Sequence, residues 1–252
     1  VAVMDTGIFR HMDFDTRIAG FADFVGRKKY LYDDNGHGTH VAGIIAGSGK
    51  GSNGKYRGIA PDTFLVSVKV LDKSGNGKIE NVVEAAGWII ENKSAMNIRV
   101  VNISFGTRAK MENGPAIETG EDDYALIMAV EKMWDSGIVV VAAAGNNGPG
   151  NTSVTAPGIS KKIITVGAFD DKNFFSGRGP TRECIVKPEV VVTGSNIIAC
   201  NNHQGRYSSK SGTSMAAPVV SGAVARLIKN NPDITPKEVK IWMKSCCKKI
   251  NV

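Results

Sequence analysis

The chain has few of the features that define membrane, fibrous or disulfide-stabilised proteins. Its 252 residues include four cysteines, Cys184, Cys200, Cys246 and Cys247. These are too few and too unevenly placed for a disulfide framework, so we expect free thiols. No apolar run reaches the roughly 18–20 residues that span a bilayer. Repeats, low-complexity tracts and long linkers are missing as well, which predicts a globular chain without a membrane span.

The charge balance does not indicate a nucleic-acid or membrane partner. The net charge is +7, but lysines and arginines are scattered, and no basic stretch alternates with aromatic residues. The densest cluster is Arg27, Lys28 and Lys29, next to Tyr30. Basic clusters of this size are typical of a solvated surface, whereas nucleic-acid sites gather charge on one face. We therefore expect no nucleic acid and no membrane among the partners, and a monomer.

Length and composition predict one α/β domain over residues 1–252. The chain opens directly on an apolar strand at Val1, and natural proteins rarely start inside a core strand, so we expect further residues upstream. Free thiols favour a reducing, cytoplasmic compartment, and a cysteine-poor secreted bacterial protein is the alternative.

Apolar runs alternate with helical patterns along the chain. Strands with buried faces are predicted at 1–4, 64–71, 100–103, 138–144, 162–169 and 189–192. Helices are predicted at 37–46, 79–93, 122–136, 214–230 and 236–248. This alternation favours a doubly wound, mostly parallel sheet with helices on both faces.

Polar residues follow three of the predicted strands directly. Asp5 follows the first strand, Ser104 the third and Asn146 the fourth. Ligands bind at the carboxyl ends of strands in such sheets, so we expect these side chains to share one edge and to form the functional site.

Three short motifs contain residue types that suit nucleophilic catalysis. Ser214 lies among small residues (GTSMAAP, 212–218) where a helix begins, so free amides face it, although helix-start serines are more often N-caps. His37 lies in HGTHVAG (37–43), where His40 at that spacing makes a weak metal site. Asp5 ends a buried strand, where its charge needs a partner such as histidine, or where it only starts a turn.

Together these motifs, in the order Asp, His, Ser, resemble the signatures of the subtilisin-like serine peptidases. The resemblance covers nearly the whole chain and implies a subtilisin-like fold and a serine endopeptidase that acts through an acyl-enzyme intermediate on polypeptide substrates. It implies that Asp5, His37 and Ser214 form a catalytic triad. The segment AAAGNNG (142–148) matches a fourth motif, which implies that Asn146 donates its amide to the oxyanion, although the same residues suit a turn.

The resemblance also implies a set of substrate-binding residues. An extended peptide would lie between two backbone segments, with side chains entering pockets beside them. The matching positions are Gly75, Asn76 and Gly77; Ser104, Phe105 and Gly106; Ile79 and Val82; Ala142, Ala143, Ala144 and Gly145; and Lys210. Lys210 could favour an acidic residue after the cleaved bond or point into water, and Asp33 and Asp34 could favour a basic residue two positions before it.

The implied chemistry needs no cofactor and no metal. Family members often hold a structural calcium ion, but the loop 47–56 that replaces the usual calcium loop contains no carboxylate, which argues against calcium there. The resemblance further implies an N-terminal propeptide, and none is visible in the sequence. Two other functions compete: a nucleotide-binding protein, whose P-loop pattern fails at Ile44, and a pseudoprotease that only binds peptides, which the complete triad disfavours.

Overall fold

The computed structural model describes residues 1–107 and 120–248. In this part of the chain, seven strands form one parallel sheet in the order β2-β3-β1-β4-β5-β6-β7, and two more form a separate antiparallel hairpin, β8-β9. The strands are β1 (Ala2–Asp5), β2 (Ile18–Asp23), β3 (Leu65–Lys69), β4 (Val100–Ile103), β5 (Val139–Ala143), β6 (Ile164–Ala168), β7 (Val190–Val192), β8 (Ile197–Cys200) and β9 (Tyr207–Lys210).

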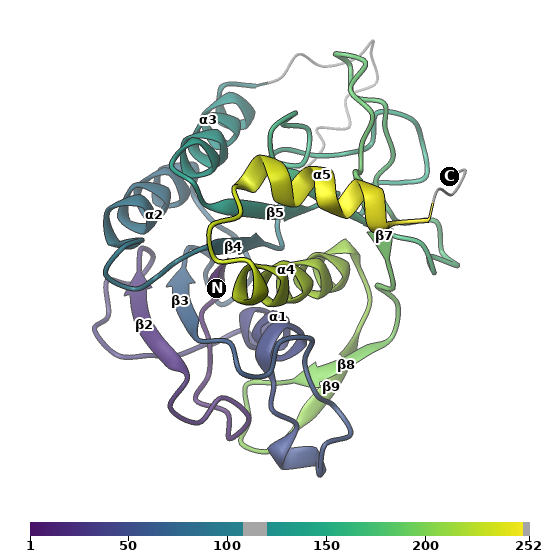
Figure 1. Cartoon of the computed structure of the whole chain (residues 1–252). Coiled ribbons are helices and arrows are strands. Elements are labelled where there is room, and N and C mark those ends of the chain that lie inside the picture. Colours follow the sequence, from purple (N-terminus) through teal and green to yellow (C-terminus); the bar gives the residue numbers. More distant parts are fainter. Residues whose placement is uncertain (108–119, 249–252) are drawn as a thin grey trace.

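Helices cover both faces of the sheet (Figure 1). Helices α2 (Ile79–Asn92) and α3 (Glu121–Asp135) pack side by side on one face, where they form one apolar core with the sheet. Helices α1 (His37–Ala46), α4 (Thr213–Asn230) and α5 (Pro236–Cys246) pack on the opposite face. A short 3₁₀ turn, Lys50–Ser52, lies in the loop after α1. No helix among the described residues is long and apolar enough to cross a membrane.

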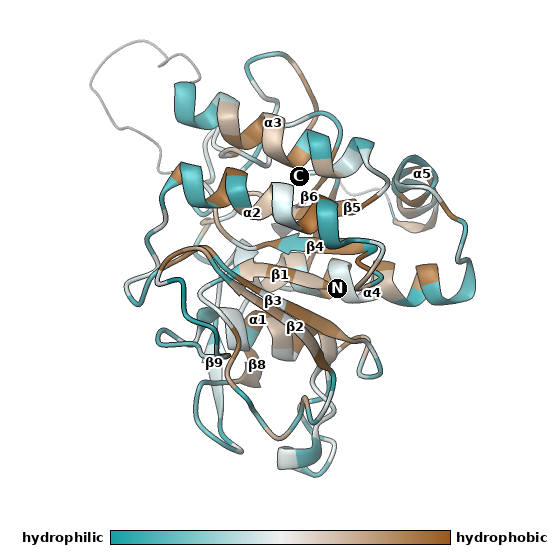
Figure 2. Cartoon of the chain, turned by 90° about the vertical axis from the view of Figure 1, so that its left-hand side faces the viewer, coloured by the Kyte–Doolittle hydropathy of each residue, from teal (hydrophilic) through white to brown (hydrophobic). Residues whose placement is uncertain are grey.

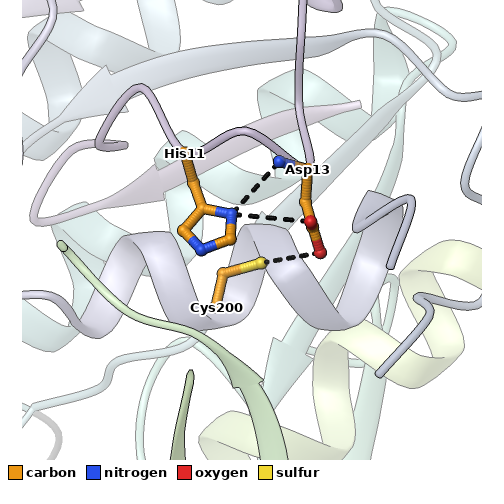
Figure 3. Close-up of side chains that lie close together, drawn as sticks. All are labelled: His11, Asp13 and Cys200. Atoms are coloured by element: carbon orange, nitrogen blue, oxygen red, sulfur yellow. Dashed lines mark hydrogen bonds and ion pairs between the residues drawn. The ribbon is translucent and has the colours of Figure 1, made fainter. Parts of the chain in front are cut away.

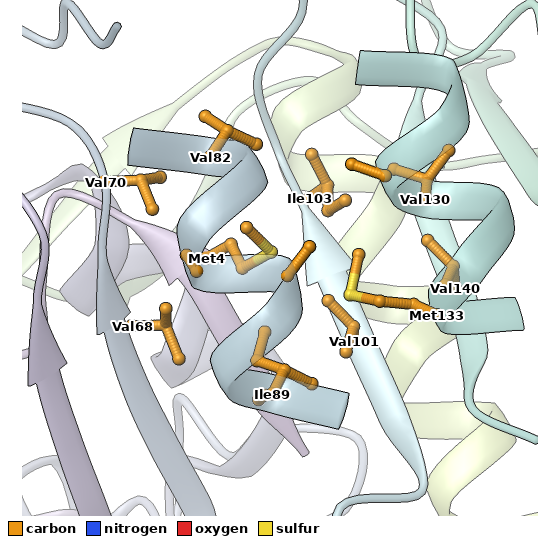
Figure 4. Close-up of a cluster of buried hydrophobic side chains, with 14 of the residues drawn as sticks. Met4, Val68, Val70, Val82, Ile89, Val101, Ile103, Val130, Met133 and Val140 are labelled. Carbon is orange, nitrogen blue, oxygen red and sulfur yellow. The ribbon is translucent and has the colours of Figure 1, made fainter. Parts of the chain in front are cut away.

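The two cores follow from the alternation of side chains along each strand. In β4, Val101 and Ile103 face the α2 and α3 side, whereas Val100 faces α4. Because both faces are covered, the central strands are mostly apolar, although β4 contains the buried Asn102 and β3 the buried Ser67 and Lys69. The strands of the sheet are largely brown or pale in the hydropathy view (Figure 2). Figure 4 shows the larger core, in which Met133 and Ile89 extend from their helices toward the strands.

The predicted fold class is confirmed, and each predicted strand and helix is present with ends shifted by a few residues at most. Sequence reasoning missed β2 and the hairpin β8-β9. Strand β2 is an edge strand whose register shifts between Ile18 and Gly20, and most of its side chains are only half-buried, so it lacks a continuous apolar run. Strand β9 reads YSSK and has a single aromatic residue, which gives no strand signal.

The sheet order places the polar residues as predicted. Strands β1, β4 and β5 are neighbours and run in parallel, so their carboxyl ends lie at one edge. Asp5 is the last residue of β1, and Ser104 and Asn146 follow β4 and β5. The amino ends of α1 and α4, which pack against each other, bring His37 and Ser214 to the same edge.

The α2 core should dominate the stability of this face. Ile89 is fully buried, whereas Val83 on the same helix is 42% exposed. We expect Ile89→Ala to lower the free energy of unfolding by about 2–5 kcal/mol, because it leaves a cavity between α2 and the sheet. Val83→Ala should change it by less than about 0.5 kcal/mol. Chemical denaturation of both variants measures the difference, and equal losses would contradict this picture of the core.

Candidate active site

A buried carboxylate and an imidazole meet at the edge of the sheet. Asp5 has no exposed surface, and its Oδ1 and Oδ2 lie 2.8 and 2.9 Å from Nδ1 of His37. Oδ1 also accepts the backbone N–H of Thr6 at 2.7 Å. Burial alone lowers the pKa of His37, but the charge and hydrogen bond of Asp5 outweigh it, so this pKa lies above its usual value. The expected partner of Asp5 is therefore histidine, and Asp5 does more than start a turn.

The loop before His37 is organised by a second buried carboxylate, Asp33. Its two oxygens accept the N–H groups of Asn35, Gly36 and Thr39 and the hydroxyls of Thr6 and Thr39 at 2.5–3.1 Å. Asp33 is only 6% exposed and these donors occupy its oxygens, so its carboxylate is held by the protein itself, and a preference for a basic substrate residue stays a prediction.

Close backbone approach explains the glycine after the histidine. A Cβ atom at Gly38 would lie 2.1 Å from the carbonyl oxygen of Gly7, so the start of α1 can approach the end of β1 only with glycine there. His40, on the buried side of the same helix, has its Nε2 3.1 and 3.0 Å from the carbonyl oxygens of Ile197 and Ser208, so the Nε2–H group is the donor. It ties α1 to the β8-β9 hairpin, and is buried among protein atoms as the sequence interpretation favoured.

Ser214 is the second residue of α4, and the N-cap is Gly212, so the alternative that Ser214 caps the helix is wrong. Its hydroxyl donates to the carbonyl oxygen of Ser104 at 2.8 Å, and the Ser104 hydroxyl donates back to the Ser214 carbonyl at 2.9 Å. Among the hydrogen bonds of the described residues, Ser214 is thus joined to Ser104 and not to His37. Hydrogen bonds of catalytic groups are often completed only in the substrate complex.

Asn146 is oriented by Thr213, a residue to which sequence reasoning gave no role. The side-chain Oδ1 of Asn146 accepts from the backbone N–H and the hydroxyl of Thr213 at 2.9 and 3.0 Å. The Thr213 hydroxyl in turn accepts the N–H of Gly145 at 3.1 Å. With its oxygen held in this way, Asn146 presents its NH₂ group as the donating end, next to the residue that precedes Ser214. The sequence signal that could have indicated this role is the threonine, Thr213, that directly precedes Ser214 in the motif.

The remaining predicted substrate-binding residues divide into exposed and buried groups. Gly75, Asn76 and Gly77 form an exposed turn whose backbone is fixed by the Asp72 carboxylate, which accepts from Ser74 and Asn76. Ile79 is half-buried and Gly106 is exposed, but several others have little exposed surface. Those that are buried, or that pack largely against the core, are Val82, Ser104, Phe105, Ala142, Ala143 and Ala144, whereas Gly145 is half-buried.

Lys210 ends β9, and its positive charge acts on His37, whose pKa it lowers, so it lies near the imidazole. Asp34 has a side chain that is 41% exposed, but its Oδ1 lies 2.7 Å from Nζ of Lys69. The charged residues that shift the pKa of His37 are Asp5 and Asp33, which raise it, and Lys210, which lowers it.

One cluster among the described residues has the side chains of a metal site. His11, Asp13 and Cys200 are buried, and one ligand atom of each lies within 4.8 Å of the others (Figure 3). Every one of these atoms already has a protein partner. The Cys200 thiol donates to Asp13, and Nδ1 of His11 accepts the Asp13 N–H at 3.1 Å. Burial raises the pKa of the Cys200 thiol, which disfavours the thiolate that a metal would need. We therefore interpret the cluster as a hydrogen-bonded part of the core and not as a metal site.

A parallel α/β sheet with a carboxylate–imidazole pair and a serine at one edge is the arrangement that the resemblance to the subtilisin-like serine peptidases implied. A model of the Subtilase family matches residues 1–249, and the chain belongs to this family.

Individual relatives agree with this assignment. Serine protease AprX of Bacillus subtilis (strain 168) is 42% identical over 97% of the chain, which spans 60% of the AprX length. Subtilisin DY of Bacillus licheniformis is 35% identical over 95% of the chain and 80% of its own length. Among solved structures, a cold adapted subtilisin-like serine proteinase has a TM-score of 0.79 and 32% identity, covering 97% of this chain and 80% of that one.

The contact between Asp5 and His37 predicts a specific change in titration. Asp5→Asn removes the charge that raises the pKa of His37 and leaves burial, which lowers it, so this pKa should fall. An NMR titration of the histidine ring protons measures the shift. His11, whose pKa is lowered by burial and acted on by Asp13 instead of Asp5, serves as an internal control and should not move. An unchanged His37 would contradict the pairing.

Proposed function

We propose that Ser214, His37 and Asp5 hydrolyse peptide bonds through an acyl-enzyme intermediate. The observation that carries the proposal is the 2.8 Å contact between Nδ1 of His37 and the buried Asp5 carboxylate. A carboxylate there holds the proton on Nδ1, so Nε2 is the basic nitrogen that faces outward. Subtilase membership supports the assignment of these roles.

The first half of the reaction forms the acyl-enzyme. Oγ of Ser214 leaves the Ser104 carbonyl and attacks the scissile carbonyl carbon, and its proton passes to Nε2 of His37. The resulting oxyanion accepts hydrogen bonds from the Asn146 NH₂ group and from the Ser214 backbone N–H, which has no partner inside the helix at this position. As the C–N bond breaks, His37 gives its proton to the leaving amine.

Water completes the second half. His37 takes a proton from the water molecule that attacks the ester carbon, and returns it to Oγ of Ser214 when the acid product leaves. Asp5 stays ionised throughout and stabilises the imidazolium in both halves. Each proton thus moves between Ser214, His37 and the substrate, and no metal or cofactor takes part. We propose that residues 1–252 form one catalytic domain.

The substrate is a polypeptide bound as an extended strand. The turn at 75–77 and the backbone at 104–106 supply main-chain donors and acceptors, which tolerate many sequences. Ile79 supports an apolar preference four residues before the cleaved bond, and Lys210 supports an acidic preference after it, because its charge already acts on His37. An exposed pair with Lys210 would contribute only about 0–1 kcal/mol.

We further propose that the loop at 47–56 needs no calcium ion. The structure places a carboxylate from outside the loop, Asp13, against it, and this carboxylate was not part of the sequence interpretation. Its oxygens accept the N–H groups of Gly49 and Gly51 at 3.1 and 2.8 Å and the Tyr207 hydroxyl at 2.9–3.0 Å. These donors occupy the lone pairs that a hard cation would use.

Labelling with a fluorophosphonate tests the proposed chemistry. The wild-type protein should be modified at Ser214, and Ser214→Ala should not be labelled. His37→Ala should reduce turnover of a peptide substrate by about 10⁶. Asn146→Ala should lower kcat by about 10²–10³ with little change in KM, because its amide binds the oxyanion and not the substrate. Peptide binding without labelling would favour the pseudoprotease.

Chelation tests the calcium proposal. The melting temperature should change by less than about 2 °C in EDTA, because the backbone amides that hold Asp13 stay in place. A larger loss that added calcium restores would contradict it. Gly51→Pro removes one of these donors and should destabilise the loop whether or not EDTA is present.

A further inference from the structure

A buried ammonium lies beside the carboxylate–imidazole pair. Lys69 is the last residue of β3, where it pairs in register with Asp5 of β1. Only 1% of Lys69 is exposed, although lysine is rarely buried unless it has partners. Desolvating an ammonium costs several kcal/mol, so its partners must be arranged with some accuracy.

Three acceptors use the three hydrogens of this ammonium. Nζ of Lys69 donates to the carbonyls of Thr6 at 2.6 Å and Leu71 at 2.9 Å, and to Oδ1 of Asp34 at 2.7 Å. The ring of Tyr32 lies 4.9 Å from Nζ and covers the ammonium on another side. Asp34 is the one anion in this set, and its partial exposure makes it the part of the pair that can be altered without opening the core.

Each acceptor belongs to a segment with a proposed function. Thr6 directly follows Asp5, and Asp34 lies three residues before His37. Leu71 begins the connection to the turn at 75–77, and the side-chain amide of Asn35 donates to the carbonyl of Lys73 in that connection at 3.0 Å. The ammonium therefore joins the segments that carry the acid, the base and one side of the substrate groove.

We infer that Lys69 and Asp34 form a positioning pair that fixes the relative placement of Asp5 and His37. The inference rests on the proposed roles of these two residues. Neither member of the pair touches the reacting atoms, and each acts through the backbone that it holds. A small misplacement of a catalytic group is costly, since about 1 Å can reduce rate 10²-fold.

The pair also sets the charge near the imidazole. Asp5 and Asp33 favour protonated His37, whereas Lys210 has the opposite effect, and His40, on the same helix, is neutral near pH 7 because burial lowers its pKa to about 4. The negative charge of Asp34 neutralises the positive charge of Lys69, so the two residues together have little effect on the protonation of His37. Asp34→Asn removes one anion and leaves the ammonium of Lys69 uncompensated, which disfavours imidazolium. The acid limb of the kcat/KM profile should then move to lower pH, because His37 loses its proton more easily.

The experiment compares Asp34→Asn, Asp34→Glu and Asp135→Asn in the full chain, with kcat, KM and the pH profile measured on one peptide substrate. Asp135, the last residue of α3, is the matched control, because it forms a partly exposed ion pair with Lys162 at 2.8 Å near the amino end of β5, opposite the edge that carries Asp5. Asp34→Asn should lower kcat about tenfold and move the acid limb down by about half a pH unit. Asp34→Glu keeps the charge and should keep the wild-type limb, and Asp135→Asn should change neither quantity.

Three results would overturn the inference: an Asp34→Asn profile like that of Asp135→Asn, a loss confined to KM, or a loss confined to the melting temperature. Fluorophosphonate labelling separates this failure from failure of the proposed function. If wild-type Ser214 is labelled and Asp34→Asn behaves as wild type, only the positioning role fails. If wild-type Ser214 is not labelled, the proposed chemistry fails instead.

Discussion

The charge of Asp5, held at the end of a fully buried strand, is the constraint on which this edge of the sheet depends. A carboxylate in that position is stable only if donors surround it, and the molecule supplies them from the next residue and from His37. Holding His37 in reach requires the sharp loop before α1, and Asp33 organises that loop through five hydrogen bonds. The buried Asp5 carboxylate thus requires His37, and the loop that holds His37 requires the buried Asp33 carboxylate. Thr6, Gly36 and Thr39 supply donors to Asp33.

Much of the fold and the central part of the site could be predicted from the sequence, because their signals are local. The strands before Asp5, Ser104 and Asn146 are nearly continuous apolar runs, and their alternation with helices predicts the parallel sheet that the structure shows. The pairing of Asp5 with His37 was also predictable, since a buried charge needs a partner. Strand β2 was missed because it is a half-buried edge strand that pairs with β3, which is distant in sequence. The hairpin was missed because β8 and β9 are only four residues long each and YSSK carries little strand signal.

The interactions that could not be predicted all join residues that are far apart in the chain. Asp13 contacts the loop at 47–56 and Tyr207, Lys69 contacts Thr6 and Asp34, and Thr213 contacts Asn146. Nothing in the local pattern around Lys69 distinguishes it from a surface lysine that ends a strand. The structural role of Asp33 was not foreseen either, because its burial and its contact with Thr6 arise only on folding. Burial decides the role of these charged side chains, and burial depends on the tertiary structure.

The parallel sheet has a consequence for when the chain can first cut a peptide bond. Strand β1 pairs with β3 and β4, so Ala2 lies beside Val66 and Val101, and parallel pairing at such separations requires large loops to close before any ladder forms. Asp5, His37, Asn146 and Ser214 come from the ends of elements that only this sheet brings together. A nascent or partly folded chain therefore has no assembled nucleophile. The proposed catalytic groups come together only when the sheet is complete.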